Sequence, residues 1–275
     1  MIIQVEEKSG FPLYFGPCQG RIHSRYRDPS FIDAISDCGQ LLNQPECQIL
    51  LEGRNRVGVV SIKRQDEEVE VVLKEFQSRG VNKLKSLFLP SKALRAWKGS
   101  VNLIERGIDT PFPIAFLEKR KRGFLDQSFY LTEKIEEAEE IRFLFRRASP
   151  EKLKPLLVAL ANHLSVCHQK GVLHRDLSDG NILVKEDEKG KSRFYFLDTN
   201  RIRFPRKINL LRRVKNLIRL GVPAPYQSFF LKQYLGENHR FLWFWYRINK
   251  IIYTSYVAFK RKLRLRQLAQ KLKIQ

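Results

Sequence analysis

The stretch that decides the fold reads Leu173-His174-Arg175-Asp176-Leu177-Ser178-Asp179-Gly180-Asn181-Ile182-Leu183-Val184. It contains the pattern H-R-D-x-x-x-x-N, which is typical of phosphoryl-transfer sites. In such sites the Asp accepts the proton of the substrate hydroxyl and the Asn holds a magnesium ion. A second Asp, on the strand that follows, takes the metal that bridges the ATP phosphates. The pattern therefore makes Asp176 the candidate base, and Asn181 and Asp198 the candidate metal ligands.

Apolar runs between Asn181 and Asp198 predict a β-hairpin. Residues 182–184 and 194–197 read as its strands and 186–190 as its turn, so the second strand delivers Asp198. The alternative is a helix-to-strand turn whose polar residues are incidental. The complete eight-residue pattern, flanked by strand-like runs and followed by an apolar strand that ends in Asp, favours the catalytic interpretation.

Length and composition bound the class of protein. A chain of 275 residues, 43% hydrophobic, has enough apolar residues for a real core and can form one large domain or two lobes. The cysteines form no C-x-x-C pair and have no metal-ligand spacing, which is typical of a reducing compartment and argues against a disulfide scaffold or zinc site. The first residues lack a basic start and a sustained apolar run, so no secretory segment is expected.

The net charge of +22 is concentrated at the C-terminal end. Residues 199–275 contain 19 Lys and Arg against one acid, Glu237, and so carry +18. This asymmetry predicts an anionic partner for the last third of the chain, either a membrane surface or a nucleic acid.

The first half of the chain reads as a sheet. No role is assigned to residues 1–47, whereas 48–53, 57–63 and 69–76 read as strands. The turn between the first two strands is a candidate phosphate cover, because Gly53 and Gly58 would let backbone approach a triphosphate and two cations could add charge. These cations are Arg54 and Arg56. A plain hairpin turn without ligand is the alternative.

Lys74 lies in Val71-Val72-Leu73-Lys74, which has the form of the V-A-I-K strand whose Lys holds the α- and β-phosphates. A lysine on a strand is usually a solvated side chain, but the place of Lys74 on the third strand of a meander favours the catalytic role. A helix is predicted over 91–106, capped by Ser91 and stopped by Gly107. It provides no obvious acid to pair with Lys74.

Residues 129–135 read as a strand that runs into a linker. An apolar strand followed by Thr132-Glu133 before a mainly helical half is typical of an adenine-binding hinge. Backbone groups of Glu133 and Ile135 are the candidate donors and acceptors. A helix is predicted over 153–170, under the catalytic loop. Its His163 and His168 have no acid or Cys at ligand spacing, so we interpret them as structural residues.

Together these residues resemble the eukaryotic-like kinase superfamily over about 48–205, and within it the bacterial lipopolysaccharide core (Kdo/heptose) kinases. The most similar pieces are 96–113, the 173–184 loop and 196–201. The resemblance implies an α+β, two-lobed protein-kinase-like fold. It has an N-terminal extension (1–47), an N-lobe of antiparallel sheet plus helix (48–132) and a mainly helical C-lobe with a basic, aromatic tail (133–275).

The resemblance also implies an activity. It is the transfer of phosphate from ATP, with magnesium, to a sugar hydroxyl of the lipid-linked core, at the cytoplasmic face of the inner membrane. Asp176 would be the base, Asn181 and Asp198 the metal ligands, and Lys74 the phosphate anchor.

Departures from the protein-kinase pattern favour a small, non-peptide acceptor. Ser178 stands where Ser/Thr kinases have Lys, Asp198-Thr199-Asn200 replaces D-F-G, and no A-P-E follows. In many relatives an acid stands at about the position of Ala96. The carboxylate that pairs with Lys74 is therefore not identified, and Glu105, near the end of the helix, is a poor substitute.

The C-terminal tail interleaves large aromatics with cations over 241–259, and basic residues then lead into Leu263, Leu265, Leu268 and Leu272. Aromatics beside cations favour the headgroup layer of a membrane, and the charges within 242–259 argue against a spanning helix. A solvated helix face is the alternative.

The sequence thus predicts an ATP- and magnesium-dependent kinase of a lipid-anchored sugar in lipopolysaccharide biosynthesis. It would be cytoplasmic, peripheral at the inner membrane and without a nucleic-acid partner. Two alternatives stay open: a kinase-like scaffold whose basic third binds membrane or RNA, and a protein kinase, which the missing A-P-E disfavours. Oligomeric state is not predicted.

Overall fold

The computed structural model describes residues 10–53, 55–78, 80–236 and 240–262. Within these ranges the chain divides into two compact units, one of 10–102 and 111–136, the other of 103–110 and 137–262. The first is built on an antiparallel sheet and the second is mainly helical. The predicted α+β class is therefore confirmed.

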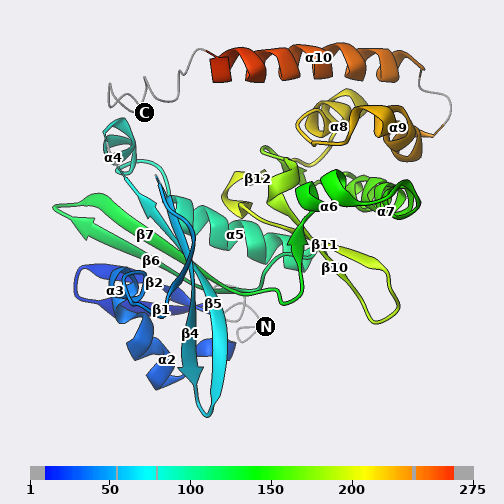
Figure 1. Ribbon diagram of the computed structural model, residues 1–275. Coiled ribbons are helices and arrows are strands. Elements are labelled where there is room, and N and C mark those ends of the chain that lie inside the picture. The colour runs from blue at the N-terminus through cyan, green and yellow to red at the C-terminus, as the bar shows by residue number, and fades with distance from the viewer. Residues whose placement is uncertain (1–9, 54, 79, 237–239, 263–275) are drawn as a thin grey trace. The chain divides into compact units, whose positions relative to one another are not determined.

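A seven-stranded sheet with the order β1-β2-β6-β7-β5-β4-β3 forms the first unit (Figure 1). All of its strand pairs are antiparallel. The strands are β1 (Phe11–Phe15), β2 (Cys18–Ile22), β3 (Gln48–Leu51), β4 (Asn55–Arg64), β5 (Glu67–Gln77), β6 (Pro113–Lys121) and β7 (Phe124–Glu133). The strands predicted at 48–53, 57–63 and 69–76 correspond to β3, β4 and β5.

The described part of the N-terminal segment is built into this sheet. Strand β1 pairs with β2, and β2 pairs with β6 about a hundred residues further along the chain. Gly20 permits this pairing, because a Cβ there would lie 1.9 Å from the Phe116 carbonyl oxygen. The segment predicted as an extension thus supplies strands to the sheet.

Successive residues of a strand point to opposite faces, and here each face has its own cover. Leu131 of β7 belongs to a core with α2 (Pro29–Ala34) and α3 (Cys38–Leu41). Its neighbour Tyr130 packs instead with α5 (Lys92–Glu105) and donates a hydrogen bond of 2.6 Å to Ser100 Oγ. A shorter helix, α4 (Val81–Lys85), precedes α5.

The boundaries of α5 confirm those predicted from the sequence. Ser91 Oγ accepts a hydrogen bond from Leu94 N at 2.9 Å, as a helix N-cap does. Gly107, with φ of 61°, ends the helix in the left-handed conformation that glycine adopts without strain.

The second unit contains one core shared by its helices and short strands. The helices are α6 (Ile141–Arg147), α7 (Pro150–Gln169), α8 (Leu210–Leu217), α9 (Gln227–Leu235) and α10 (Arg240–Lys262). Helix α7 corresponds to the helix predicted at 153–170 and begins earlier, because Pro150 suits its first turn. Tyr246 of α10 is fully buried in this core, so α10 is part of the unit.

Short strands carry the motif residues of this unit. The predicted hairpin is confirmed as β10 (Ile182–Glu186) and β11 (Ser192–Phe196), with Ile182 opposite Phe196. Strand β8 (Glu139–Glu140) extends this sheet, while β9 (Leu173–His174) pairs with β12 (Ile202–Arg203). Both ends of the catalytic stretch are therefore fixed by strand pairing. Among the described helices, none is long and apolar enough to cross a membrane.

Candidate active site

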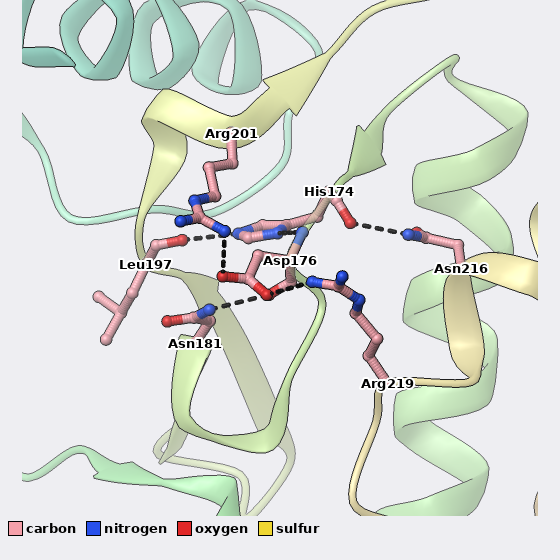
Figure 2. A network of polar contacts seen from close by, with 7 residues as sticks. All are labelled: His174, Asp176, Asn181, Leu197, Arg201, Asn216 and Arg219. Atoms are coloured by element: carbon pink, nitrogen blue, oxygen red, sulfur yellow. Dashed lines mark hydrogen bonds and ion pairs between the residues drawn. The ribbon is translucent and has the colours of Figure 1, made fainter. Parts of the chain in front are cut away.

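His174 ties the catalytic loop to the strand that precedes Asp198 (Figure 2). Its ring is 1% exposed; Nε2 lies 2.8 Å from Leu197 O, and Nδ1 accepts a hydrogen bond from Asp176 N at 3.1 Å. A carbonyl can only accept, so Nε2 carries the proton and the ring is neutral. Burial lowers the pKa of His174, which favours the same neutral form. One buried imidazole therefore positions both candidate aspartates through their backbone.

Asn181 closes the loop onto Asp176. Its Nδ2 donates to Asp176 O at 2.8 Å, and its own carbonyl accepts from Leu197 N at 2.9 Å. The structure therefore brings together the three residues that the sequence pattern selected, Asp176, Asn181 and Asp198. Because the Asn181 nitrogen is used within the loop, its amide oxygen is the group suited to a cation.

Asp198 begins a tight turn with left-handed backbone, φ 54° and ψ 42°. Asp and Asn adopt this conformation more readily than other residues with a side chain. The following 3₁₀ turn, η4 (Thr199–Arg201), reverses the chain and brings Arg201 to Asp176. The turn that follows Asp198 thus places a cation, Arg201, beside the candidate base.

Two guanidinium groups bind the Asp176 carboxylate. Arg201 Nη1 lies 2.7 Å from Oδ2, and Arg219 Nη1, from the segment after α8, lies 2.6 Å from Oδ1. The Asp176 side chain is 26% exposed, while those of Arg201 and Arg219 are 52% and 43% exposed. Ion pairs this accessible contribute about 1 kcal/mol or less to stability. Their main effect is to place positive charge at the candidate base.

A buried polar chain supports the loop from behind. Asn216 of α8 donates to His174 O at 2.7 Å, and its Oδ1 lies 3.0 Å from His168 Nε2. Tyr234 OH lies 2.5 Å from the other nitrogen, His168 Nδ1. Since Asn216 Oδ1 accepts, His168 donates through Nε2 and accepts from the tyrosine. His168, predicted as structural, thus links α7, α8 and α9 behind the loop.

These buried histidines predict an acid-sensitive fold. Burial lowers the pKa of His163 and of His168 to about 4, below the usual 6.5. Between pH 6.5 and 4 the unfolded chain binds more protons than the folded one, so the free energy of unfolding decreases as pH falls. Denaturant unfolding from pH 7.5 to 4.5 measures this. His168→Gln should reduce the slope, and an unchanged slope would contradict the assignment of His168.

The first unit contains the candidate nucleotide-binding residues, beginning with Lys74. On β5, Lys74 shares a face with Phe76, and its Nζ lies 5.2 Å from the centre of that ring. Phe76 packs in one cluster with Ala96 of α5, which is 2% exposed. The buried acid next in sequence, Glu75, points to the other face and accepts from Gln127 Nε2 at 2.8 Å. Glu105 falls in the other unit.

Two residues of the predicted phosphate-covering turn, Arg56 and Gly58, make contacts within the protein. Gly53 is exposed, with open space where a Cβ would project. Gly58 is buried in β4, and a Cβ there would lie 2.5 Å from Cys47 Sγ, so packing accounts for this glycine. Arg56 is used within the protein, because its Nη2 donates to Leu42 O at 2.9 Å. Arg54 lies outside the described residues.

The candidate hinge follows β7. Glu133 N donates to Phe112 O at 3.0 Å, so of its two backbone groups only the carbonyl could serve a nucleotide. The Glu133 carboxylate accepts from Tyr26 OH at 2.5 Å and lies 3.6 Å from Arg25. Ile135 follows the strand and is half-buried. The Glu133 side chain is thus anchored by the N-terminal segment.

The comparisons with known proteins can be set against this geometry. The model of the lipopolysaccharide kinase (Kdo/WaaP) family matches residues 82–234, more than half of the chain. The chain belongs to this family. The match contains the catalytic loop, Asp198 and both arginines; it begins after Lys74 and ends before α10. The resemblance seen in the sequence is thereby confirmed.

A solved structure, WaaP in complex with acyl carrier protein, has a TM-score of 0.54 with 20% identity. The likeness covers 79% of this chain and 91% of that one. At this identity it shows the fold alone, and it confirms the kinase-like fold. A probable serine/threonine-protein kinase of Dictyostelium discoideum, fnkE, is 31% identical over 78 residues, or 26% of this chain. The chain covers only 6% of that protein. Membership of this kinase family confirms the predicted enzyme class, a phosphotransferase.

Sequence reasoning missed the two arginines that bind Asp176. Arg201 lies directly after Asp198-Thr199-Asn200, and Arg219 lies 43 residues after Asp176 in the basic region whose charge predicted only an anionic partner. The available signal was Ser178. A catalytic loop without the usual lysine needs a cation from elsewhere.

Proposed function

We propose that this chain is an ATP-dependent kinase that phosphorylates a Kdo or heptose hydroxyl of the lipopolysaccharide inner core at the cytoplasmic membrane face. The observation that carries the proposal is the grouping of Asp176, Asn181 and Asp198 around the buried His174. Family membership supports the choice of a lipopolysaccharide acceptor.

Asp176 acts as the general base in this proposal. The acceptor oxygen attacks the γ-phosphorus, a new P–O bond forms, the bond to the β-phosphate oxygen breaks, and the hydroxyl proton passes to the Asp176 carboxylate. A carboxylate has about four lone-pair sites, so the two guanidinium contacts leave room for the acceptor hydroxyl. His174 and Asn181 fix the backbone that carries this group.

The donor set of the site fits magnesium. Mg²⁺ is usually held by one or two carboxylates together with substrate phosphates and water. Asp198 provides a carboxylate, and the Asn181 amide is held through its nitrogen, which presents its oxygen. When bound, the ion neutralises charge on the β- and γ-phosphates. Asp198 and Asn181 are the residues that would hold it.

Lys74 is proposed to anchor the ATP phosphates. Lys74→Met should raise KM for ATP about 10- to 100-fold, because a hydrogen bond to a charged group contributes about 1.5–3 kcal/mol. Steady-state kinetics against ATP concentration would measure this. Lys63→Met, an exposed change in the neighbouring strand β4, is the matched control. An unchanged KM in Lys74→Met would contradict the role of Lys74, and with it the proposed nucleotide site that also includes Gly53, Glu133 and Ile135.

The acceptor can be identified directly. The purified protein, ATP and Mg²⁺ are incubated with dephosphorylated lipopolysaccharide, and mass spectrometry locates any added phosphate. One phosphate on an inner-core sugar is the expected result. Transfer to protein substrates in place of lipopolysaccharide would favour the protein-kinase alternative, and no transfer to either, with intact nucleotide binding, would favour the scaffold.

Helix α10 supports a location at the membrane surface. Its exposed apolar residues recur every three or four positions and form one stripe: Phe241, Phe244, Ile248, Ile251, Ile252, Tyr256 and Phe259. Exposed cations accompany the stripe, among them Arg247 and Lys260. An apolar stripe with flanking cations is typical of a helix that lies in the headgroup layer. The leucines predicted to continue it, from 263 onward, lie outside the described residues.

The combined change Phe244→Ser and Ile251→Ser should weaken binding to anionic liposomes about tenfold or more, since each removes apolar area from the stripe. Liposome co-sedimentation at increasing salt, beside an RNA titration, measures this. Because both side chains are exposed, the fold should be retained. Tight RNA binding without liposome association would reverse the choice of partner.

A further inference from the structure

Helix α10 holds the segment that presents Arg219 to Asp176. Lys250 of α10 donates to Ile218 O at 2.7 Å and to Leu220 O at 2.6 Å, the carbonyls on either side of Arg219. Tyr253, one turn further along α10, lies 5.9 Å from the Arg219 guanidinium, measured to the ring centre. Helix α10 thus contacts the backbone on either side of Arg219 as well as its side chain.

The same segment packs against the catalytic loop. A Cβ on Gly221 would lie 2.4 Å from Asp179 Oδ2, so the chain approaches the loop as closely as glycine allows. Arg219 then reaches Asp176 Oδ1 at 2.6 Å. Displacing the segment would therefore move Arg219 relative to the base.

The proposed membrane-binding role of α10 does not account for the buried position of Lys250. Its burial lowers its pKa to about 8, so the folded protein tolerates an unfavourable environment for this charge. The ammonium group donates to two carbonyls, and both belong to the segment that flanks Arg219. Lys250 differs in this from the cations of α10 that are exposed, such as Arg247.

Positive charge at the base has a chemical use. Charge on the phosphoryl group under transfer must be stabilised, and arginines that do so raise kcat by about 10³- to 10⁵-fold. The catalytic loop contains Ser178 in place of a lysine, while Arg219 comes from outside the loop. Arg219 is therefore suited to the role that the loop leaves unfilled.

We infer that α10 is a positioning element of the active site: Lys250, assisted by Tyr253, holds Arg219 beside Asp176, where Arg219 stabilises the phosphoryl group under transfer. This inference rests on the proposed phosphoryl transfer. It assigns a catalytic contribution to a helix that lies beyond the matched region of the family. Helix α10 would then have two functional faces: one contacts the segment around Arg219, and the other is exposed and apolar.

A double-mutant cycle tests the inference in the full-length protein. Arg219→Gln should lower kcat for ADP formation about 10²-fold or more with little change in KM for ATP, and Lys250→Met should lower it about tenfold. If Lys250 acts through Arg219, the double variant is no slower than Arg219→Gln alone. If the two single changes lowered kcat independently, so that their effects multiplied in the double variant, the inference would be overturned. Lys154→Met, the same Lys-to-Met change at an exposed position of α7, should retain full activity.

Hydrogen exchange provides a readout that does not depend on catalysis. Lys250→Met should speed amide exchange in 218–221 and around 176, whereas Lys154→Met should not. Tyr253→Leu is the second variant, for the case that Lys250→Met does not fold. It should lower kcat in the protein with Arg219 but not in the Arg219→Gln variant. Unchanged exchange in 218–221, with unchanged kcat in Tyr253→Leu, would refute the positioning role. An active Asp198→Asn variant would instead refute the proposed function.

Discussion

Asp198→Asn is expected to lower phosphoryl transfer about 10³-fold or more while the fold is retained. A metal ligand at the phosphates supplies several kcal/mol of charge stabilisation in the transition state, and each 1.36 kcal/mol is tenfold in rate. Asn is the preferred substitution because Asp198 has φ of 54°, which Asn tolerates and Ala does not. The change therefore removes the charge and keeps the turn that carries Arg201.

The measurement is kcat for ADP formation across a range of Mg²⁺ concentrations, beside thermal unfolding. Asp187→Asn, in the turn between β10 and β11, is the matched control, since it makes the same change in the same hairpin. Asp198→Ala should lose as much activity and also some stability, because of its backbone. Full activity in Asp198→Asn would contradict the assignment of the metal site and, with it, the proposed function.

Asp176→Asn is the second large expected effect, a decrease in kcat of about 10²- to 10⁴-fold, the usual contribution of a positioned base. KM for ATP should change little, because the group acts on the acceptor. Stability should also change little, because the ion pairs to Arg201 and Arg219 are between about a quarter and a half exposed. Steady-state kinetics with thermal unfolding would check both points.

The outcome at Asp176 separates two roles for its carboxylate. If it only anchored the arginines, Arg201→Gln combined with Arg219→Gln would reproduce the loss, and Asp176→Asn would add nothing to that double variant. If Asp176 acts as the base, adding Asp176→Asn to the double variant should lower kcat further. A changed KM with unchanged kcat would contradict the assignment of Asp176 as base.

The catalytic loop could be predicted from the sequence because its geometry is largely local. Asp176 and Asn181 are joined by a hydrogen bond across five residues, and the hairpin that leads to Asp198 follows from alternating apolar residues. The bounds of α5 were readable for the same reason, since a capping Ser and a stopping Gly act on adjacent backbone.

The parts that could not be predicted depend on contacts distant in sequence. Strands β1 and β2 are short and interrupted by Gly and Pro, and they are stabilised by β6. Arg219 and Lys250 belonged to a basic region whose charge suggested only an anionic partner. Their contacts with Asp176 and with Leu220 require the helices to pack first. Gly58 was interpreted through a ligand, whereas the neighbouring Cys47 accounts for it.

The contacts of Asn216 and Lys250 also matter while the protein is being made. The candidate base and metal ligands have all been translated once the ribosome passes Asp198. The hydrogen bond that supports His174 needs Asn216, which is translated later. The hydrogen bonds that hold the segment around Arg219 need Lys250, which is translated later still. A nascent chain halted between these points would contain the whole signature without an ordered base. Premature stop codons as late as residue 249 should therefore yield products with reduced activity, and we expect a nascent chain to reach full activity only after α10 has emerged from the ribosome.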